Sequence, residues 1–141
     1  MNLTFEMLLE EDIPQLKEIL GRYMESPQQV REFVSEKQNI AIVAKLDGKV
    51  VGLVYGYFLT CFHNVKPQFF IYSVDIHEKY QGKGCGTKFM RHVVDWARDN
   101  GFSESFVMTD ESNSHACKVY KKAGMTNDEA DATRVYEVHY K

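Results

Sequence analysis

The stretch from Gln68 to Gly86 reads QFFIYSVDIHEKYQGKGCG and joins an apolar segment to a glycine-rich one. Its first part, through Ile76, is rich in aromatic and β-branched residues and too short for an ordinary helix, so it predicts a strand buried on both faces. Its last part carries Gly82, Gly84 and Gly86 at alternate positions. The apolar residues that follow recur with helical periodicity. The predicted order is therefore strand, glycine-rich turn and helix.

A glycine-rich turn that leads into a helix is suited to bind an anion. The first turn of a helix leaves about four backbone N–H groups without internal partners, and the helix dipole favours negative charge there. Glycine has no Cβ atom to hold a phosphate away from those groups. The alternatives are a turn that only joins strand to helix and, for Lys83, a solvated side chain. The residues predicted to hold phosphate are Gln81, Gly82, Lys83, Gly84, Cys85 and Gly86.

Two familiar phosphate-binding motifs do not match this loop. A Walker A loop requires G-x-x-x-x-G-K-[ST], whereas Gly86 is followed by Thr87 and then Lys88. A dinucleotide fingerprint requires G-x-G-x-x-G after a first strand, whereas these glycines are spaced G-x-G-x-G and lie past mid-chain. The spacing that matches is Q/R-x-x-G-x-G/A, filled by Gln81, Gly84 and Gly86.

The composition limits the class of protein. The chain has 141 residues, of which 44% are hydrophobic and 26% charged, so we predict one globular domain over residues 1–141. Its net charge of −3 and its lack of basic clusters argue against a nucleic-acid partner. It has no long apolar run, and its start, MNLTFEMLLEED, is unlike a secretory signal. We therefore expect a cytoplasmic protein with no membrane partner.

The cysteines and histidines indicate neither a disulfide framework nor a metal site. The three cysteines are odd in number and contain no C-x-x-C pair, which favours packing roles in a reducing compartment. The five histidines show no H-E-x-x-H or similar spacing. We predict no metal.

Start and turn signals order the rest of the chain. Asp12 before Ile13-Pro14 and Ser26 before Pro27 predict helix N-caps, and Asp47-Gly48 predicts a tight hairpin. Strands are expected over residues 2–9, 39–46, 49–59, 68–76, 102–109 and 134–140, and later helices over residues 84–100 and 113–123. This order predicts an α/β fold with a mixed, mostly antiparallel central sheet and helices on both faces.

A second motif, NSHACKVYKKAGM, covers residues 113–125. Together with the glycine loop it resembles the GNAT superfamily of N-acetyltransferases, in which a pattern close to N-x-x-A-x-x-[LV]-Y-x-K-x-G-[FM] follows the fifth strand. The resemblance implies that the loop holds the pyrophosphate of acetyl-coenzyme A, a cosubstrate. The pattern is filled in register by Asn113, Ala116, Val119, Tyr120, Lys122, Gly124 and Met125.

The resemblance extends to the small aminoglycoside 3-N-acetyltransferases of that superfamily. It rests on residues 39–57, on Ile71-Tyr72 ahead of the loop, and on Asp110 ahead of Tyr120. Where that subgroup has an aspartate after the Ile-Tyr pair, this chain has Ser73. The departure leaves both the acceptor and the catalytic base open.

The implied reaction moves an acetyl group to a primary amine of a small molecule, aminoglycoside-like or polyamine-like, by direct attack in a ternary complex. Tyr120 is the predicted acid for the departing thiolate, since a phenol with a pKa near ~10 stays protonated at pH 7. Asp75 is the candidate base and shares a strand face with Ser73 by the period of two. Other members have a glutamate on the opposite face, where this chain has Phe70 and Tyr72, so a water relay is the alternative.

Further residues are assigned to the cosubstrate and to the acceptor. The backbone of Val74 and Ile76 is expected to pair with the pantetheine arm as an added strand would, with Asn113 contacting the arm. The Ile76 N–H is the candidate donor to the oxyanion. Asp110 and Glu137 are candidate contacts for the substrate amine.

Three alternatives stay open at this point. The protein could instead be a non-catalytic acyl-coenzyme A sensor or partner module, or an enzyme that acetylates proteins or peptides, because either would need the same phosphate-binding loop. Tyr136 and Tyr140 are expected either on the surface or in a homodimer interface.

Overall fold

The computed structural model describes residues 2–21, 26–127 and 134–140. In these residues a sheet of five strands has the order β1-β2-β3-β4-β5. Along the chain the elements are β1 (Leu3–Met7), the 3-10 helix η1 (Glu10–Leu16), α1 (Lys17–Leu20), α2 (Pro27–Ser35), β2 (Asn39–Leu46), β3 (Lys49–Leu59), β4 (Gln68–Ile76), the 3-10 helix η3 (Glu78–Tyr80), α3 (Cys85–Asp99), β5 (Glu104–Val107) and α4 (Ser114–Lys122).

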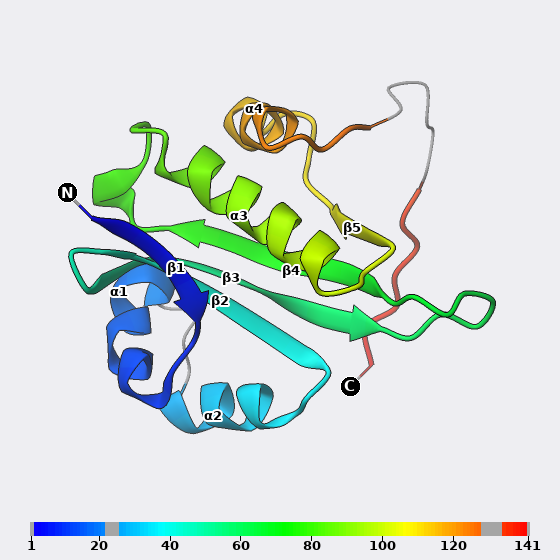
Figure 1. Cartoon of the computed structure of the whole chain (residues 1–141), viewed down its shortest axis with the longest axis horizontal. Coiled ribbons are helices and arrows are strands. Elements are labelled where there is room, and N and C mark those ends of the chain that lie inside the picture. Colours follow the sequence, from blue (N-terminus) through cyan, green and yellow to red (C-terminus); the bar gives the residue numbers. More distant parts are fainter. Residues whose placement is uncertain (1, 22–25, 128–133, 141) are drawn as a thin grey trace.

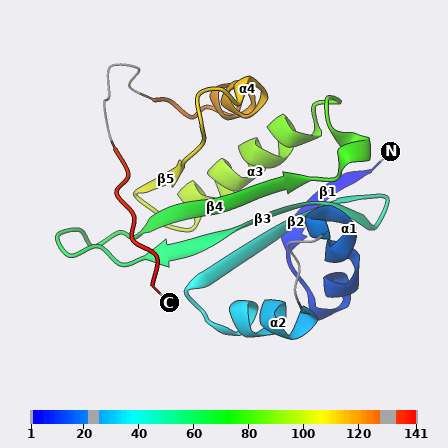
Figure 2. The ribbon, with the colours of Figure 1, turned by 180° about the vertical axis from the view of Figure 1, so that it is seen from behind.

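Helices cover both faces of this sheet. Helices α3 and α4 lie on one face, and α1 and α2 lie on the other (Figure 1). The view from behind shows the same two layers (Figure 2). Strands β1 to β4 pair antiparallel, whereas β5 pairs parallel to β4. The predicted α/β architecture, with a mostly antiparallel sheet between helices, is confirmed.

Two apolar clusters hold the helices on the sheet. On the α3 side, Phe69 and Ile71 of β4 pack in one fully buried cluster with Phe89 of α3. Burying one apolar stripe in this way is what stabilises an amphipathic helix. The cluster on the other face contains Leu16, Ala41, Val43, Val50 and Leu53.

The two predicted helix starts had different outcomes. Ser26 caps α2 as predicted, because its Oγ accepts a hydrogen bond from the Gln29 N–H at 3.2 Å. Asp12 as an N-cap was wrong, since η1 begins at Glu10. The Asp12 carboxylate instead reaches back and accepts from the Leu9 N–H at 2.8 Å. An acidic side chain inside the first turn satisfies the same unpaired N–H groups as a cap residue does.

The predicted hairpin between β2 and β3 is confirmed. Asp47 and Gly48 have φ of 50° and 85°, the positive values that a two-residue type I′ turn requires. The Asp47 carboxylate also accepts from the Asn2 N–H at 2.8 Å, which ties the start of β1 to the turn.

The last predicted strand is wrong. Residues 134–140 form no strand, and Tyr136 and Tyr140 are 92% and 89% exposed. Val135 and Val138 lie three residues apart, so a strand would turn them to opposite faces. A strand also requires a neighbour for its backbone, and none of the described strands pairs with this segment.

A β-bulge interrupts the pairing of β3 with β4. Tyr55 lies opposite Ser73, but the next residue, Gly56, lies opposite Ile71, so Tyr72 is the extra residue. A Cβ atom at Gly56 would meet the Phe70 carbonyl oxygen at 1.9 Å. Only glycine permits this approach of the two backbones. A bulge bends its strand, and this bend follows directly on the last residue of β4 that pairs with β5.

We expect Gly56→Ala to destabilise the fold by about 3 kcal/mol or more, because the obstructing atom is backbone and cannot rotate away. Urea denaturation of the two proteins measures the difference. Gly101→Ala is the control for a glycine with no steric obstacle, since Gly101 has positive φ, unlike Gly56, and a Cβ there meets nothing within 4 Å. Gly101→Ala should lower the free energy of unfolding by only about 1–2 kcal/mol, the penalty for an alanine in a left-handed backbone conformation. Equal losses in both variants would contradict the steric role of Gly56.

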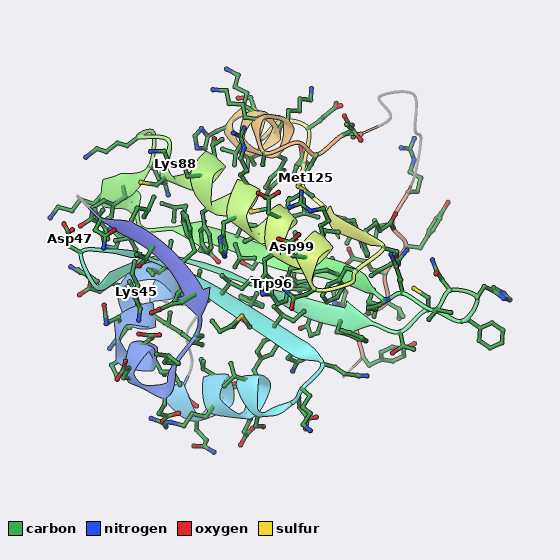
Figure 3. The ribbon with its side chains drawn as sticks, viewed as in Figure 1. Lys45, Asp47, Lys88, Trp96, Asp99 and Met125 are labelled. Carbon is green, nitrogen blue, oxygen red and sulfur yellow. The ribbon has the colours of Figure 1, made fainter. Side chains whose placement is uncertain are left out.

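A buried ion group joins β1, η1 and β2. The Lys45 ammonium is 2.8 Å from an Asp12 carboxylate oxygen and also contacts the Glu6 carboxylate. The Asp12 side chain is 2% exposed and that of Lys45 is 11% exposed. Lys45 lies beside β1 and α1 (Figure 3). Hydrogen bonding to Asp12, and then to Glu6, raises the pKa of Lys45 above its usual 10.5.

We expect Asp12→Ala to lower the free energy of unfolding by about 3 kcal/mol, because it leaves a buried ammonium short of a partner. Glu18→Ala is the control, since the Glu18–Lys49 pair is exposed and 3.6 Å long; it should cost less than about 1 kcal/mol. Because the pKa of Lys45 is raised in the folded protein, the ion group contributes fully to the free energy of unfolding below pH 10.5. This contribution is lost as the pH rises through the folded-state pKa of Lys45. If the difference in free energy of unfolding between the wild type and Asp12→Ala already decreases between pH 6 and 9, this assignment is contradicted.

Candidate active site

A cleft opens where β4 and β5 part. Strand β5 pairs with β4 only from Gln68 to Ile71, so residues 72–76 of β4 have no strand on that edge among the described residues. The cleft beside this free edge has a volume of about 530 Å³. Its lining comes from the end of β4, the glycine loop and α4, namely Val74, Ile76, Gln81, Gly82, Gly84, Gly86, Thr87, Asn113, His115, Ala116, Lys118, Val119, Tyr120 and Lys122.

Most of the residues selected from the sequence therefore meet around one cleft. The residues outside the lining are Lys83, which is exposed, Cys85 and Asp75, which are half-buried, and the candidate amine contacts Asp110 and Glu137. The sequence analysis did not select Thr87 and His115, and it used Lys122 only as part of the family pattern. The helical periodicity of α4 and the first turn of α3 are the signals that place such residues near the motifs.

The loop before α3 has the backbone conformation that its glycines permit. Gly82 and Gly84 have φ of 76° and 82°, and a Cβ at either position would meet nothing within 4 Å. Gly84 is the N-cap of α3, and no side chain caps this helix. The first hydrogen bond of the helix runs from the Lys88 N–H to the Gly84 carbonyl at 3.2 Å. The N–H groups of residues 85–87 thus have no partner within the helix.

Gly86 differs from the two loop glycines, because it lies within α3 and has no positive φ. A Cβ there would lie 3.8 Å from Val119 of α4 and 3.9 Å from Ile76, which is ordinary van der Waals contact. Gly86 therefore lies on the cleft wall between α4 and the end of β4, where a small side chain would also fit.

The end of β4 directs polar backbone groups into the cleft. The His77 N–H donates to the Val51 carbonyl of β3 at 2.8 Å, so the Ile76 carbonyl of the same trans peptide points the other way. There it accepts from the Gln81 side-chain amide at 2.9 Å. The N–H and C=O of one extended residue share an edge of the strand, so the Ile76 N–H, and that of Val74 by alternation, also face the cleft.

Gln81 has a role that the sequence analysis missed. Its backbone was expected to hold phosphate, but its side chain is used to fasten the loop to β4. The sequence did contain a signal for this role, because the first position of the Q/R-x-x-G-x-G/A motif holds a glutamine. Its side-chain amide is long enough to reach the carbonyl of Ile76, five residues earlier.

Tyr120 lies on the wall of the cleft formed by α4. Its ring packs against the main apolar cluster, and burial raises the pKa of its phenol above 10.0, with smaller contributions from the charges of Asp75 and Cys117. The direction of the shift keeps the hydroxyl protonated over the whole neutral range. Asn113 caps α4, because its side-chain oxygen accepts from the Ala116 N–H at 3.1 Å.

Asp75 lies on the other side of β4 from Val74 and Ile76. Its carboxylate accepts from the Ser73 hydroxyl at 2.6 Å, and both side chains are half-buried. The sequence analysis had Phe70 and Tyr72 on the face opposite to Ser73 and Asp75, and this was wrong. The bulge at Tyr72 shifts the alternation by one residue, so Tyr72 and Ser73 both contact Tyr55 of β3.

The two other candidate carboxylates lie outside the cleft lining. The Asp110 side chain is exposed and accepts from the Ser112 N–H at 2.8 Å. Hydrogen bonding to the Ser112 side chain, and then to its backbone, lowers the pKa of Asp110. Glu137 is exposed and lies 3.4 Å from the His139 ring nitrogen. Within residues 2–21, 26–127 and 134–140, no group of three or more acidic, histidine or cysteine side chains is arranged to hold a metal. No helix in these ranges is long and apolar enough to cross a membrane.

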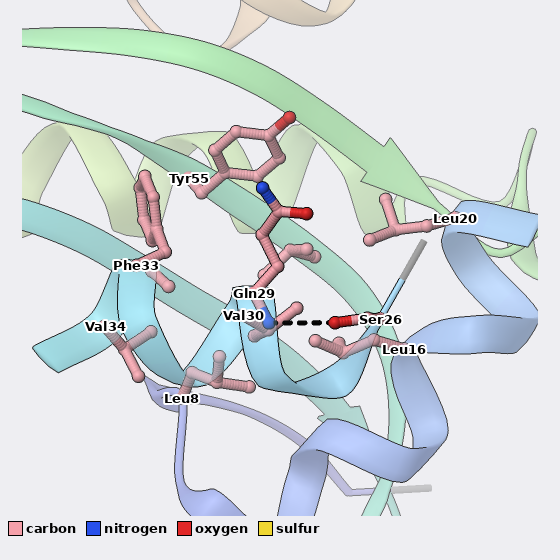
Figure 4. Close-up of a pocket in the computed structure, with 11 residues that line it drawn as sticks. Leu8, Leu16, Leu20, Ser26, Gln29, Val30, Phe33, Val34 and Tyr55 are labelled. Carbon is pink, nitrogen blue, oxygen red and sulfur yellow. Dashed lines mark hydrogen bonds between the residues drawn. The ribbon is translucent and has the colours of Figure 1, made fainter. Parts of the chain in front are cut away.

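A second pocket lies on the opposite face of the sheet, beneath α1 and α2. It has a volume of about 380 Å³ and is bordered by Leu16, Val30, Phe33 and Leu53, with the Tyr55 ring at one side (Figure 4). Its polar groups come from Ser26, Gln29 and the Tyr55 hydroxyl. The Ser26–Gln29 hydrogen bond crosses its edge (Figure 4).

Comparison with known proteins agrees with this geometry. The chain is 32% identical to the uncharacterized N-acetyltransferase YobR of Bacillus subtilis (strain 168) over 54 residues, which is 38% of this chain but only 22% of that protein. Its fold matches an aminoglycoside acetyltransferase from an uncultured soil metagenomic sample, solved in complex with sisomicin, with a TM-score of 0.81, 22% identity and 97% of both chains covered. It also matches a ribosomal-protein-alanine N-acetyltransferase from Brucella melitensis biovar Abortus 2308, with a TM-score of 0.77, 17% identity and 99% and 100% of the two chains covered.

The two structural matches are below 25% identity and describe the fold, while their named substrates differ. The family model is more specific. The model of the acetyltransferase (GNAT) family matches residues 5–125, a range that contains the glycine loop, the free edge of β4 and Tyr120. This chain belongs to the acetyltransferase (GNAT) family.

Proposed function

We propose that this protein transfers an acetyl group from acetyl-coenzyme A to a primary amine of a small molecule. One observation carries the proposal: the free edge of β4, the open glycine loop and Tyr120 of α4 border the same cleft. Each of the three matches a chemical need of a thioester cosubstrate, namely a partner for its amide-containing arm, a cradle for its phosphates and a proton for its leaving group.

The residues present fit acetyl-coenzyme A. The N–H groups of residues 85–87 lack helical partners, and Gly82 and Gly84 leave the loop open, so a pyrophosphate can approach the backbone. The polar edge at Val74 and Ile76 suits the two amides of pantetheine, which then add to the sheet like a short strand. Asn113, at the start of α4, is at hand to contact the same arm. Lys83 contributes long-range charge only, because it does not line the cleft.

The reaction balances with groups that this chain supplies. An ammonium R–NH3+ reacts with the thioester to give the amide R–NH–CO–CH3, a free thiol and one proton: the C–N bond forms and the C–S bond breaks. The Ser73–Asp75 pair, directly or through water, accepts the first proton from the amine, whose pKa near ~10.4 keeps it charged at pH 7. The Ile76 N–H donates to the oxyanion, and Tyr120 protonates the departing thiolate. The nitrogen then loses its surplus proton to solvent and keeps one in the amide. Exchange with solvent reprotonates Tyr120 and deprotonates the Ser73–Asp75 pair, so one proton is released per turnover.

The direct test is thiol release from acetyl-coenzyme A by the purified protein, with aminoglycosides, polyamines, amino acids, aromatic amines and short peptides as acceptors. We expect release with one class of small amine and a product heavier by one acetyl group in mass spectrometry. Release only with peptides would favour protein or peptide acetylation instead. Coenzyme binding by calorimetry without turnover on any amine would favour an acyl-coenzyme A sensor, a reading motivated by Ser73 in place of the subgroup's aspartate. Absence of both would refute the proposal.

For the acid role, we expect Tyr120→Phe to lower kcat roughly 100-fold or more, because it removes the proton for the leaving group while it keeps the ring in place. The affinity for acetyl-coenzyme A, measured by calorimetry, should stay within about twofold. The raised pKa of Tyr120 implies that wild-type activity does not fall through ionisation of this phenol until the pH exceeds 10.0.

Tyr136→Phe is the matched control for the loss of a phenolic hydroxyl, since Tyr136 is 92% exposed and does not line the cleft. Its kcat should equal that of the wild type. Turnover by Tyr120→Phe at the wild-type rate would remove Tyr120 from the mechanism.

A further inference from the structure

Six aromatic side chains form a continuous set of contacts on the face of the sheet that carries Asp75. Tyr55 and Tyr72 stack with their ring centroids 5.9 Å apart, and Phe70 stacks on Phe106 at 4.9 Å. Tyr57 joins the two pairs, at 5.8 Å from Tyr72 and 6.2 Å from Phe70. These distances lie in the range of favourable ring pairs. We call this set the aromatic row; it comprises Phe33, Tyr55, Tyr57, Phe70, Tyr72 and Phe106.

The aromatic row is not sealed from solvent. The Tyr72 side chain is 58% exposed although it stands in the middle of the row. Phe33 and Tyr55, at the other side of the row, also border the pocket beneath α1 and α2. An apolar surface therefore runs from open solvent at Tyr72 into that pocket. An exposed aromatic side chain that continues into an apolar pocket offers a surface on which a ligand can pack.

The row ends at the reaction centre. Tyr55 and Tyr72 adjoin the Ser73–Asp75 pair, whose hydrogen bond is 2.6 Å long. The charge of Asp75 acts both on Tyr55 in the row and on Tyr120 in the cosubstrate cleft. Asp75 therefore stands at the junction of the two surfaces, where an amine on the row and a thioester in the cleft would meet.

Acidic groups are sparse along the same strands. Strands β3, β4 and β5 contain two carboxylates, Asp75 and Glu104. Glu104 accepts from the Gln68 side chain at 2.8 Å, at the opposite end of β4. Seven residues of strand at ~3.3 Å each separate Gln68 from Asp75 by roughly 23 Å. A polycationic sugar needs several carboxylates close together, whereas these strands offer one at the junction.

We infer that the acceptor is a primary amine joined by a short chain to an aromatic ring, an inference that rests on the proposed function. The ring packs on Tyr72 and Tyr55, and the ammonium lies beside Asp75, which compensates its charge. The step is the one given above: the nitrogen attacks the thioester carbon, the C–S bond breaks, and the ammonium loses one proton to the Ser73–Asp75 pair and one to solvent. To the several ammonium groups of an aminoglycoside, the strands of this face offer one carboxylate near the junction, that of Asp75.

The test compares kcat/KM for phenylethylamine, propylamine and an aminoglycoside at saturating acetyl-coenzyme A. We expect phenylethylamine to exceed propylamine roughly tenfold or more, since the ring makes contacts that a short alkyl chain cannot make. The aminoglycoside should be the poorest acceptor. Equal or better turnover of propylamine or of the aminoglycoside would overturn the inference and leave the proposed function standing.

Variants locate the preference on the aromatic row. Tyr72→Ala should bring the ratio of phenylethylamine to propylamine kcat/KM close to one, mainly through KM, while Tyr72→Phe should keep the wild-type ratio. Phe62→Ala is the control, because Phe62 is 95% exposed and contacts His63 rather than the row. An unchanged ratio in Tyr72→Ala would show that the row does not bind the acceptor.

Two further results distinguish the inference from the proposed function. If no amine is acetylated but the coenzyme binds, the proposed function fails. Calorimetric titration of phenylethylamine into the coenzyme-loaded protein then tests whether the aromatic row binds an aromatic amine. Binding heat that Tyr72→Ala abolishes supports an aromatic-amine site, and no heat refutes it. A dimer in light scattering that Tyr72→Ala dissociates would make the row an interface between copies and overturn the assignment.

Discussion

The approach of Gly56 to the Phe70 carbonyl is the constraint on which the rest of the site depends. Without a side chain at Gly56, the backbones of β3 and β4 come close enough for Tyr72 to bulge out of register. The bulge bends β4 immediately after its last pairing with β5. A flat continuation would let β5 pair along the whole of β4. The parting of the two strands instead leaves a polar backbone edge of β4 free next to β5.

Because of this bend, the end of β4 presents backbone groups on one side and polar side chains on the other. Toward α3 and α4, Val74 and Ile76 present backbone groups to a cleft whose other walls are the glycine loop and α4. Toward α1 and α2, Tyr72, Ser73 and Asp75 follow the shifted alternation and face the aromatic row. The same single extra residue therefore opens the cleft beside the glycine loop and turns the Asp75 carboxylate toward the aromatic row.

The two sides differ in what they are made of. The cleft depends on backbone geometry: positive φ at Gly82 and Gly84, unpaired N–H groups at the start of α3, and a strand edge. Such features need only a few glycines and a correct fold. The other side depends on side chains, which can change without disturbing the sheet. This division is consistent with structural relatives of 17% and 22% identity that share the fold but whose named substrates are an aminoglycoside and a ribosomal protein.

The sequence by itself determined the features that are local. The glycine loop, the hairpin at Asp47-Gly48, the Ser26 cap and the register of the motif around Tyr120 each follow from residues within a few positions of one another, because turn and cap conformations depend on neighbouring residues. The tertiary structure decided what depends on distant partners. The face of Phe70 and Tyr72 relative to Asp75 was misjudged because a residue on another strand, Gly56, sets the bulge. The ion group of Asp12 with Lys45 joins segments 33 positions apart in the chain. The expected strand at residues 134–140 has no partner among the strands that the structure describes, and a strand needs a neighbour to form its ladder of hydrogen bonds.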